Sequence, residues 1–290
     1  MKGKESISGF KLINDRKGIF LVKEEYFERL KSKGLFDINK LSKNNSFKRF
    51  SAGRGKPLVV SLDGKNQEKV VIRFYHHGGA FRWLFRSLFF DSKRSIRELI
   101  LIEKISKLGV PTLKVVAAIA SRVFPGIFKH ALITIEEKNA KDLLKFLEKE
   151  KNLKKKWRVL EEAGRVVRLL HKCNVAHADL HPRNMLVTND NPPKVLIIDL
   201  DQSFMYEKLG TKARVRAFAR LERFLIKLSE REGLNFGKRE RLRFLKGYYK
   251  KFDSTVKHEL KLIEKRLERW LPWHRGVWVV ERFLTRKQGG

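Results

Sequence analysis

The feature that most constrains the fold is a polar segment between two apolar flanks, VAHADLHPRNMLV at residues 175–187. Before it, apolar residues recur at helical spacing in KKKWRVLEEAGRVVRLLHKC, which predicts a long helix over residues 154–173. After it, NMLV and KVLIID predict short strands on either side of TNDNPP. A segment of histidine, aspartate, proline, arginine and asparagine is poorly suited to a helix or a core. It must be either solvated or functional.

The region before residue 137 is rich in predicted strands. PLVVSL and KVVIRFY are β-branched and aromatic runs separated by a turn-rich stretch, which predicts a hairpin. VVAAIASRVF and HALITIE predict two more strands. SKRSIRELILIEKISKLGVP predicts a helix that a serine or aspartate at residue 91 or 92 caps and that ends before Gly109 and Pro111. IFLVKEEYFERLKSKG predicts an earlier helix that ends near Gly34.

After Asn139 the pattern becomes helical, with AKDLLKFLEKE as one helix and a mostly helical, basic stretch from about residue 211 onward. The expected fold class is therefore α+β with two lobes. Residues 1–138 would form a strand-rich lobe with a basic N-terminal extension. Residues 139–290 would form a helical lobe.

The charge balance points to an anionic partner. The chain has 66 lysine and arginine residues against 32 aspartate and glutamate residues, a formal net charge of +34. Nucleic acid, an anionic membrane surface or a phosphorylated glycolipid would all suit that charge. The sequence shows neither an N-terminal signal-peptide pattern nor an apolar run of membrane-spanning length, so a cytoplasmic protein is expected. The single cysteine, Cys173, excludes an intramolecular disulfide and is interpreted as a small buried residue at a helix end.

Three residues with oxygen-bearing side chains are expected to converge. Asp179 and Asn184 lie in the polar segment, and Asp199 lies at the end of the next predicted strand. Mg²⁺ prefers oxygen ligands of this kind and commonly completes its shell with phosphate and water. A carboxylate beside such a site can accept the proton of an attacking hydroxyl group. Phosphoryl transfer needs little more from a protein than positioning and charge stabilisation, so these residue types suit that reaction.

The spacing of His177, Asp179 and Asn184, with Asp199 after the next strand, is similar to that of the protein kinases. The upstream elements follow the same order. A glycine-rich SAGRGKP precedes the first hairpin strand, VVIR takes the place of the usual V-A-I-K, and a glutamate lies on the next helix. These upstream residues are Gly53, Gly55, Arg73 and Glu98, the last preferred over Glu103 as the partner of Arg73.

Longer stretches resemble the lipopolysaccharide kinase family, whose members include the kinases of 3-deoxy-octulosonic acid (Kdo) and of inner-core heptose. The resemblance covers roughly residues 50–206 and is carried by VIRFYHHGGAFRWLF, RSIRELILIEKISKLGVPTLKVVAA, HALITIE and HADLHPRNMLV followed by IIDLDQS. RFYHHGG is closer to the Kdo kinases than to the heptose kinases. The resemblance implies a protein-kinase-like fold, with an antiparallel-sheet N-lobe and a mostly helical C-lobe.

The resemblance also implies an ATP-dependent kinase that phosphorylates Kdo in the inner core of lipopolysaccharide, with Kdo-lipid A as acceptor, at the inner face of the inner membrane. ATP and Mg²⁺ would be the cofactors. Asp179 would be the catalytic base, Asn184 and Asp199 would hold Mg²⁺, and His181 and Arg183 are candidate acceptor contacts. His177 is interpreted as a structural residue of the loop. Gly53, Gly55, Arg73, Glu98, Asn184 and Asp199 would form the nucleotide site.

The chain departs from the protein-kinase pattern in several places. Arginine replaces the usual lysine at Arg73, which keeps the charge and adds a planar fork that suits phosphate. Ala178 stands where protein kinases have the arginine of His-Arg-Asp, so control by a phosphorylated loop is not expected. DLD replaces Asp-Phe-Gly, which makes Asp201 a possible second acidic group. No Ala-Pro-Glu motif follows, which disfavours protein substrates.

Other functions remain open from the sequence alone. A heptose kinase of the same family and a RIO-like protein kinase, which also lacks Ala-Pro-Glu, share the pattern. A pseudokinase that binds RNA or anionic lipid would suit the charge equally well, although nucleic acid is not favoured because Asp179, Asn184 and Asp199 are all present. The aromatic and arginine-rich residues 78–90 are either core or a membrane-contacting patch, and RWLPWHRGVWVVERF near the C-terminus has the same ambiguity.

Overall fold

The chain folds into two compact units. The computed structural model describes residues 8–43, 48–49, 57–62, 68–76, 87–233 and 236–286. The first unit comprises residues 1–139 together with 200–202, and the second comprises residues 140–199 together with 203–290. The first unit therefore ends one residue beyond the expected lobe boundary at 138. Residues 200–202 belong to the first unit, whereas the sequence placed them in the second lobe.

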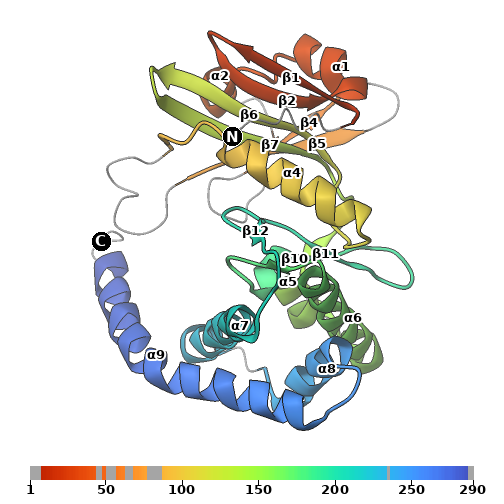
Figure 1. The fold of residues 1–290 in the computed structure, drawn as a ribbon, viewed down its shortest axis with the longest axis vertical. Helices are drawn as coiled ribbons and strands as arrows, with labels where there is room; N and C mark the ends of the chain where they lie inside the picture. The colour runs from red at the N-terminus through yellow and green to blue at the C-terminus, as the bar shows by residue number, and fades with distance from the viewer. Residues whose placement is uncertain are drawn as a thin grey trace. The chain divides into compact units, whose positions relative to one another are not determined.

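The first unit is built on an antiparallel sheet. In the described part of the chain this sheet has seven strands in the order β1-β2-β6-β7-β5-β4-β3 (Figure 1). The predicted β4–β5 hairpin and the two long strands that become β6 and β7 are confirmed. The strands are β1 (Phe10–Asp15), β2 (Gly18–Lys23), β3 (Lys48–Arg49), β4 (Leu58–Ser61), β5 (Lys69–Phe74), β6 (Val115–Phe124) and β7 (Ile127–Ile135).

The first hairpin corrects the prediction for the N-terminal region. Residues 19–23, expected in a helix, instead belong to β2, which pairs with β6 through neighbours such as Leu21 and Ala118. Asp15 Oδ1 accepts the backbone N–H groups of Lys17 at 2.7 Å and Gly18 at 3.1 Å and so closes the β1–β2 turn. The helix α1 (Phe27–Ser32) begins only after a short 3₁₀ turn, η1 (Glu24–Tyr26). The described part of the basic extension is therefore an integral part of the sheet.

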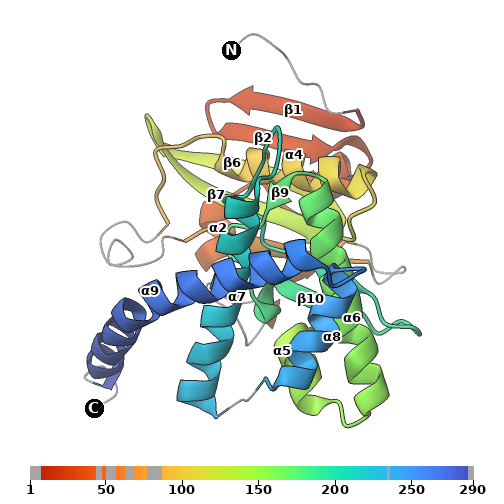
Figure 2. The ribbon, with the colours of Figure 1, turned by 60° about the horizontal axis from the view of Figure 1, so that its bottom comes forward.

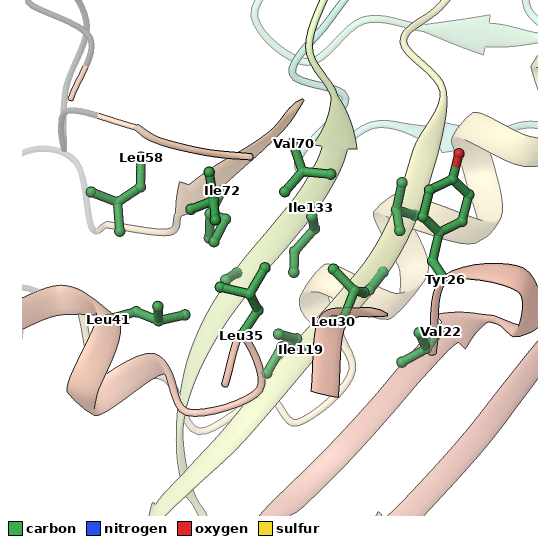
Figure 3. Close-up of a cluster of buried hydrophobic side chains, with 14 of the residues drawn as sticks. Val22, Tyr26, Leu30, Leu35, Leu41, Leu58, Val70, Ile72, Ile119 and Ile133 are labelled. Atoms are coloured by element: carbon green, nitrogen blue, oxygen red, sulfur yellow. The ribbon is translucent and has the colours of Figure 1, made fainter. Parts of the chain in front are cut away.

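Apolar side chains from α1, the following loop and α2 (Ile38–Lys43) form a core with the sheet (Figure 3). Leu30, Leu35 and Ile38 are 0–1% exposed. Burial of such side chains contributes roughly 1.5–3 kcal/mol each, so this core accounts for much of the stability of the unit. Their partners on the sheet include Val22, Leu58, Val70, Ile72, Ile119 and Ile133.

Helix α4 (Arg94–Lys107) packs against β6 and β7 (Figure 1). Its C-terminus is as predicted, since Gly109 adopts φ 84° and Val110 N donates to Ile105 O at 3.0 Å. Its N-terminus differs from the prediction, because the cap residue is Lys93 and no side chain caps the helix. The Asp91 carboxylate instead accepts the Lys93 N–H at 2.9 Å, from a position two residues before the cap residue.

The second unit is mainly helical, as predicted from residue 140 onward. Its short strands form two small sheets, ordered β11-β10-β8 and β12-β9 among the described residues. No helix in the described ranges is both long and apolar enough to cross a membrane. The helices are α5 (Leu143–Lys149), α6 (Leu153–Lys172), η2 (Pro182–Asn184), α7 (Thr211–Glu232), α8 (Lys238–Tyr248) and α9 (Ser254–Arg286), and the strands are β8 (Lys141–Asp142), β9 (Val175–Ala176), β10 (Met185–Val187), β11 (Val195–Ile197) and β12 (Phe204–Met205).

Helices α6 and α8 approach each other closely at two glycines (Figure 2). A Cβ atom on Gly164 would lie 2.0 Å from the backbone oxygen of Phe244, and one on Gly247 would lie 1.8 Å from that of Glu161. His171 is buried beside this contact, with Nδ1 2.7 Å from the Tyr248 hydroxyl, and burial lowers its pKa to about 3. The predicted helix over residues 154–173 is confirmed, and the contact holds the helix that leads into the polar segment.

Candidate active site

His177 braces the polar segment from within. The side chain is 1% exposed, and burial lowers its pKa, so the ring is neutral at physiological pH. Nδ1 accepts the backbone N–H of Asp179 at 3.0 Å, and Nε2 therefore carries the proton that it donates to Ile198 O at 2.9 Å. Both ring nitrogens are used in positioning the loop, which leaves neither for proton transfer and agrees with the structural interpretation of His177.

Asp179 is the one carboxylate in the sequence of the polar segment, and it is exposed. Its side chain is 64% exposed, and Oδ2 lies 3.3 Å from His181 Nε2. Partial burial raises the pKa of Asp179, but the hydrogen bond to His181 and the positive charges of His181 and Arg220 outweigh burial and lower the pKa overall. The carboxylate is therefore ionised near neutral pH and can accept a proton.

Asn184 and Asp199 are brought together by the β10–β11 hairpin. Met185 pairs with Ile197, and the next step of this register places Asn184 opposite Ile198, whose N–H donates to Asn184 O at 3.1 Å. Asp199 follows directly, in a left-handed backbone conformation with φ 59°. An aspartate in that conformation is uncommon and is typical of a functional or turn position.

The Asn184 side chain is held in one orientation. It is buried, and Nδ2 donates to Asp179 O at 2.9 Å and lies 3.3 Å from His181 Nε2. The hydrogen bond to Asp179 O fixes the amide group, which leaves Oδ1 as its atom suited to a metal ligand. The three residues Asp179, His181 and Asn184 thus form one connected cluster.

Asn184 and Asp199 fit a magnesium ion whose other ligands are phosphate and water oxygens. No group of three or more histidine, cysteine, aspartate or glutamate side chains in the described ranges could hold a metal ion by itself. Mg²⁺ bound with a nucleotide needs fewer protein ligands, because phosphate and water oxygens complete the octahedron. The Asn184 amide oxygen and the Asp199 carboxylate, on adjacent ends of one hairpin, supply two ligands of the right chemistry.

Arg73 and Glu98 form an ion pair in the first unit, and the Glu98 side chain is 1% exposed. Arg73 Nη2 donates to both carboxylate oxygens at 2.6 Å. The Tyr75 hydroxyl also donates to Glu98, and its ring lies 4.5 Å below the Arg73 guanidinium. Burial, followed by the charge of Glu98, raises the pKa of Tyr75 well above its usual range, so the phenol remains a donor. The expected partner of Arg73 is therefore in place.

Asp201 has a different role from the one the sequence suggested. Its carboxylate forms a two-point ion pair with Arg94 at the start of α4, through Nε at 2.9 Å and Nη2 at 2.5 Å. Both side chains are less than one fifth exposed. Asp201 is thus engaged within the first unit, which explains why residues 200–202 belong to that unit rather than to the one that contains Asp199.

The other predicted residues are distributed as follows. Gly53 and Gly55 lie outside the described residues, as do residues 77–86 of the aromatic stretch. Arg183 is half exposed, 3.4 Å from Glu232, and its guanidinium lies 5.7 Å from the Phe224 ring. Cys173 is partly buried and burial raises its pKa, which suits a structural residue rather than a nucleophile.

Sequence reasoning missed a group of arginines on α7. RVRAFARLER places Arg216, Arg220 and Arg223 at intervals of four and three residues, which is the spacing of one helix face. That spacing is the available signal in the sequence, although it lies within a generally basic stretch. Their partner Arg266 could not be assigned without the packing of α7 on α9.

This chain is similar to known proteins over most of its length. The model of the lipopolysaccharide kinase (Kdo/WaaP) family matches residues 52–248. A 3-deoxy-D-manno-octulosonic acid kinase from Actinobacillus succinogenes is 30% identical over 197 residues, which cover 66% of this chain and 78% of the relative. Another from Mannheimia succiniciproducens is 25% identical over 203 residues, which cover 68% of this chain and 82% of the relative.

The fold also matches a solved structure. WaaP in complex with acyl carrier protein aligns with a TM-score of 0.56 over 89% of this chain and 98% of the WaaP chain, at 18% identity. At that identity the likeness concerns the fold alone. The expected kinase-like α+β fold class is confirmed.

Proposed function

This chain belongs to the lipopolysaccharide kinase (Kdo/WaaP) family, and on that premise we propose that it transfers the γ-phosphoryl group of ATP to a hydroxyl of Kdo on a Kdo-lipid A acceptor. Membership makes the chain a phosphotransferase that acts on a sugar hydroxyl. The choice of Kdo is supported by relatives that carry the name 3-deoxy-D-manno-octulosonic acid kinase. The observation that carries the proposal is the connected cluster of Asp179, His181 and Asn184 beside Asp199.

Asp179 acts as the base in this proposal. The hydroxyl oxygen of the acceptor forms a bond to the γ-phosphorus, its proton passes to the Asp179 carboxylate, and the bond from the γ-phosphorus to the β,γ-bridging oxygen breaks to release ADP. The low pKa of Asp179 keeps the carboxylate ionised and ready for the proton. Two hydrogen bonds fix the backbone around Asp179. Its N–H donates to His177 Nδ1, and its carbonyl oxygen accepts from Asn184 Nδ2.

Asn184 and Asp199 would hold Mg²⁺, which would supply positive charge against the charge that develops on the phosphates. Asn184 Oδ1 is oriented for this by the hydrogen bond that Nδ2 donates to Asp179 O. Arg73, fixed by Glu98, provides the cation that binds phosphate in the nucleotide-binding half of the enzyme. Residues 136–139 complete the nucleotide site that we propose, together with Gly53 and Gly55, which lie outside the described residues.

Two substitutions separate the base from the metal ligands. Asp179→Asn should retain binding of ATP–Mg²⁺, because both metal ligands remain, and should reduce phosphotransfer to Kdo-lipid A by roughly 10² or more, the usual scale for a general base. Asp199→Asn should weaken Mg²⁺-dependent ATP binding as well as turnover. Isothermal titration with ATP–Mg²⁺ and transfer of labelled phosphate to Kdo-lipid A measure the two properties.

The matched control is Asp190→Asn, which removes a half-exposed carboxylate from the same β10–β11 hairpin, where Asp190 contacts Thr188 and Lys194. It should leave both properties unchanged. Near wild-type transfer by Asp179→Asn would reject its role as base. Transfer to heptosylated core or to a generic protein, with none to Kdo-lipid A, would reject the acceptor.

A further inference from the structure

A cavity of about 380 Å³ lies between α7 and α9 in the second unit. Four arginines and one tryptophan dominate its lining, and we call it the arginine pocket. Arg216, Arg220 and Arg223 come from one face of α7, and Arg266 and Trp270 come from α9. The Arg266 guanidinium lies 4.7 Å from the Trp270 ring, which leaves the pocket with both a cationic and an aromatic wall.

The positive charges of the arginine pocket repel one another. Burial, followed by the charge of Arg220, lowers the pKa of Arg223. Burial and then the charges of Arg216 and Arg220 lower the pKa of Arg266. Like charges at such spacing destabilise a helix, and they do so more strongly when they are partly buried.

Arg214, a neighbouring arginine on α7, differs from the pocket arginines because it forms an ion pair with a carboxylate. Arg214, on the same helix, binds Glu259 of α9 through Nε at 3.0 Å, and its pKa is raised because the charge of Glu259 outweighs burial. Among the described residues, no carboxylate forms an ion pair with Arg216, Arg220 or Arg266. These three arginines thus lie close together without an ion pair to a described carboxylate, which suits a site for an anionic ligand.

The arginine pocket lies within electrostatic reach of the catalytic loop. The His181 ring stacks on Phe224 of α7, with centroids 4.5 Å apart and an interplanar angle of 17°, and Phe224 directly follows Arg223. The charge of Arg220 lowers the pKa of Asp179, and the charge of Asp179 acts in turn on Arg223. An anion bound in the pocket would therefore sit close to the proposed base, where the acceptor sugar must also lie.

We propose that the arginine pocket binds an anionic group of the glycolipid acceptor, a carboxylate or a phosphate, while Trp270 packs on the sugar. The proposal rests on the proposed function, because it names the part of the acceptor that the second unit recognises. Guanidinium groups suit both anions through paired N–H donors. Two sources are possible in Kdo-lipid A, namely the carboxylate of Kdo itself and the phosphates of lipid A.

Steady-state kinetics with varied acceptor test the pocket. Arg216→Gln and Arg266→Gln should each raise the KM for Kdo-lipid A by about tenfold or more, the scale for loss of one charged hydrogen-bonding partner, with the KM for ATP unchanged. Arg239→Gln, which removes an exposed arginine of α8, is the control for overall charge and should change neither value. An unchanged KM for the acceptor in both pocket variants would overturn the inference.

Direct binding separates this inference from the proposed function. Titration of the wild type and of both pocket variants with free Kdo, with Kdo-lipid A and with Kdo-lipid A stripped of its phosphates reports the pocket without turnover. If the wild type binds free Kdo and both variants lose this binding, the pocket binds the Kdo carboxylate. If the variants lose binding only of the phosphorylated glycolipid, the pocket binds the lipid A phosphates. If the wild type binds an anionic acceptor through the pocket but transfers no phosphate, the proposed function fails and the pocket stands. If no variant changes binding, the pocket fails even where transfer occurs.

Discussion

At the scale of single residues, the Arg73–Glu98 pair links nucleotide binding to stability. Glu98 is 1% exposed, and both its oxygens accept hydrogen bonds from Arg73. Removal of one partner of a buried pair leaves an uncompensated charge and costs about 3–5 kcal/mol. A loss of activity in Arg73→Ala alone would therefore confuse two effects, namely the missing phosphate contact and the stranded Glu98.

A double substitution resolves the two effects. We expect Arg73→Ala to lower the free energy of unfolding by about 3 kcal/mol and to weaken ATP binding. Adding Glu98→Gln removes the stranded charge and should recover most of that stability, while ATP affinity should stay low. Urea unfolding and ATP titration measure the two quantities. Recovery of ATP affinity in the double variant would show that Arg73 serves Glu98 rather than the nucleotide.

At the scale of elements, the closest contact in the second unit is the crossing of α6 and α8. A methyl group on Gly164 would lie 2.0 Å from the backbone oxygen of Phe244. One on Gly247 would lie 1.8 Å from the backbone oxygen of Glu161, and both distances are far below van der Waals contact. Backbone atoms cannot move aside as a flexible side chain can. The two helices would have to separate, and the contact of His171 with Tyr248 would separate with them.

We therefore expect Gly164→Ala and Gly247→Ala each to lower the free energy of unfolding by about 2 kcal/mol or more, the range of overpacked cores. This runs against the usual gain of about 1 kcal/mol from replacing a helical glycine by alanine. Gly210→Ala is the control, because a Cβ there would meet nothing within 4 Å. Urea unfolding of the three variants is the measurement, and equal stabilities would show that the helices do not approach so closely.

Elements with strong local patterns could be predicted from the sequence, and others could not. The β4–β5 hairpin and α6 have clear strand and helix periodicity. The strand β1 does not, because only Phe10 of its side chains is buried and the rest are partly or fully exposed. The sequence predicts a helix for residues 19–23 of β2, because these residues run directly into the helical pattern of residues 27–32. Only pairing with β6, distant in the sequence, decides their conformation.

The candidate site shows the same division. Asp179, Asn184 and Asp199 could be found from their spacing, since one loop and one hairpin position all three. The arginine pocket depends on α7 packing against α9, and the Arg94–Asp201 ion pair depends on residues 200–202 joining the first unit. The sequence shows the helical spacing of the α7 arginines, but contacts between distant elements leave no such pattern, so the pocket and the role of Asp201 emerge only from the structure.

At the scale of the whole molecule, the net charge of +34 bears on where the enzyme works. We propose that the protein attaches peripherally to the anionic inner face of the inner membrane, where a lipid-anchored acceptor is presented. Each basic residue near such a surface adds about 1 kcal/mol of attraction, which salt screens. Residues 78–90 are expected from the sequence to be either core or a membrane-contacting patch. At the described end of this stretch Phe89 is 4% exposed and belongs to the core, whereas Phe90 is 74% exposed and could contact a membrane.

Vesicle flotation tests this attachment. The protein should float with vesicles that contain anionic lipid at low salt, should be released as salt approaches about 1 M, where the Debye length falls to about 3 Å, and should not bind neutral vesicles. If residues 78–90 contact the membrane, Phe90→Ala should weaken binding several-fold. Phe252→Ala, which removes a half-exposed phenylalanine between α8 and α9, should not. Equal binding to neutral and anionic vesicles would reject the electrostatic attachment. Binding to anionic vesicles that Phe90→Ala leaves unchanged would keep the attachment and remove Phe90 from it.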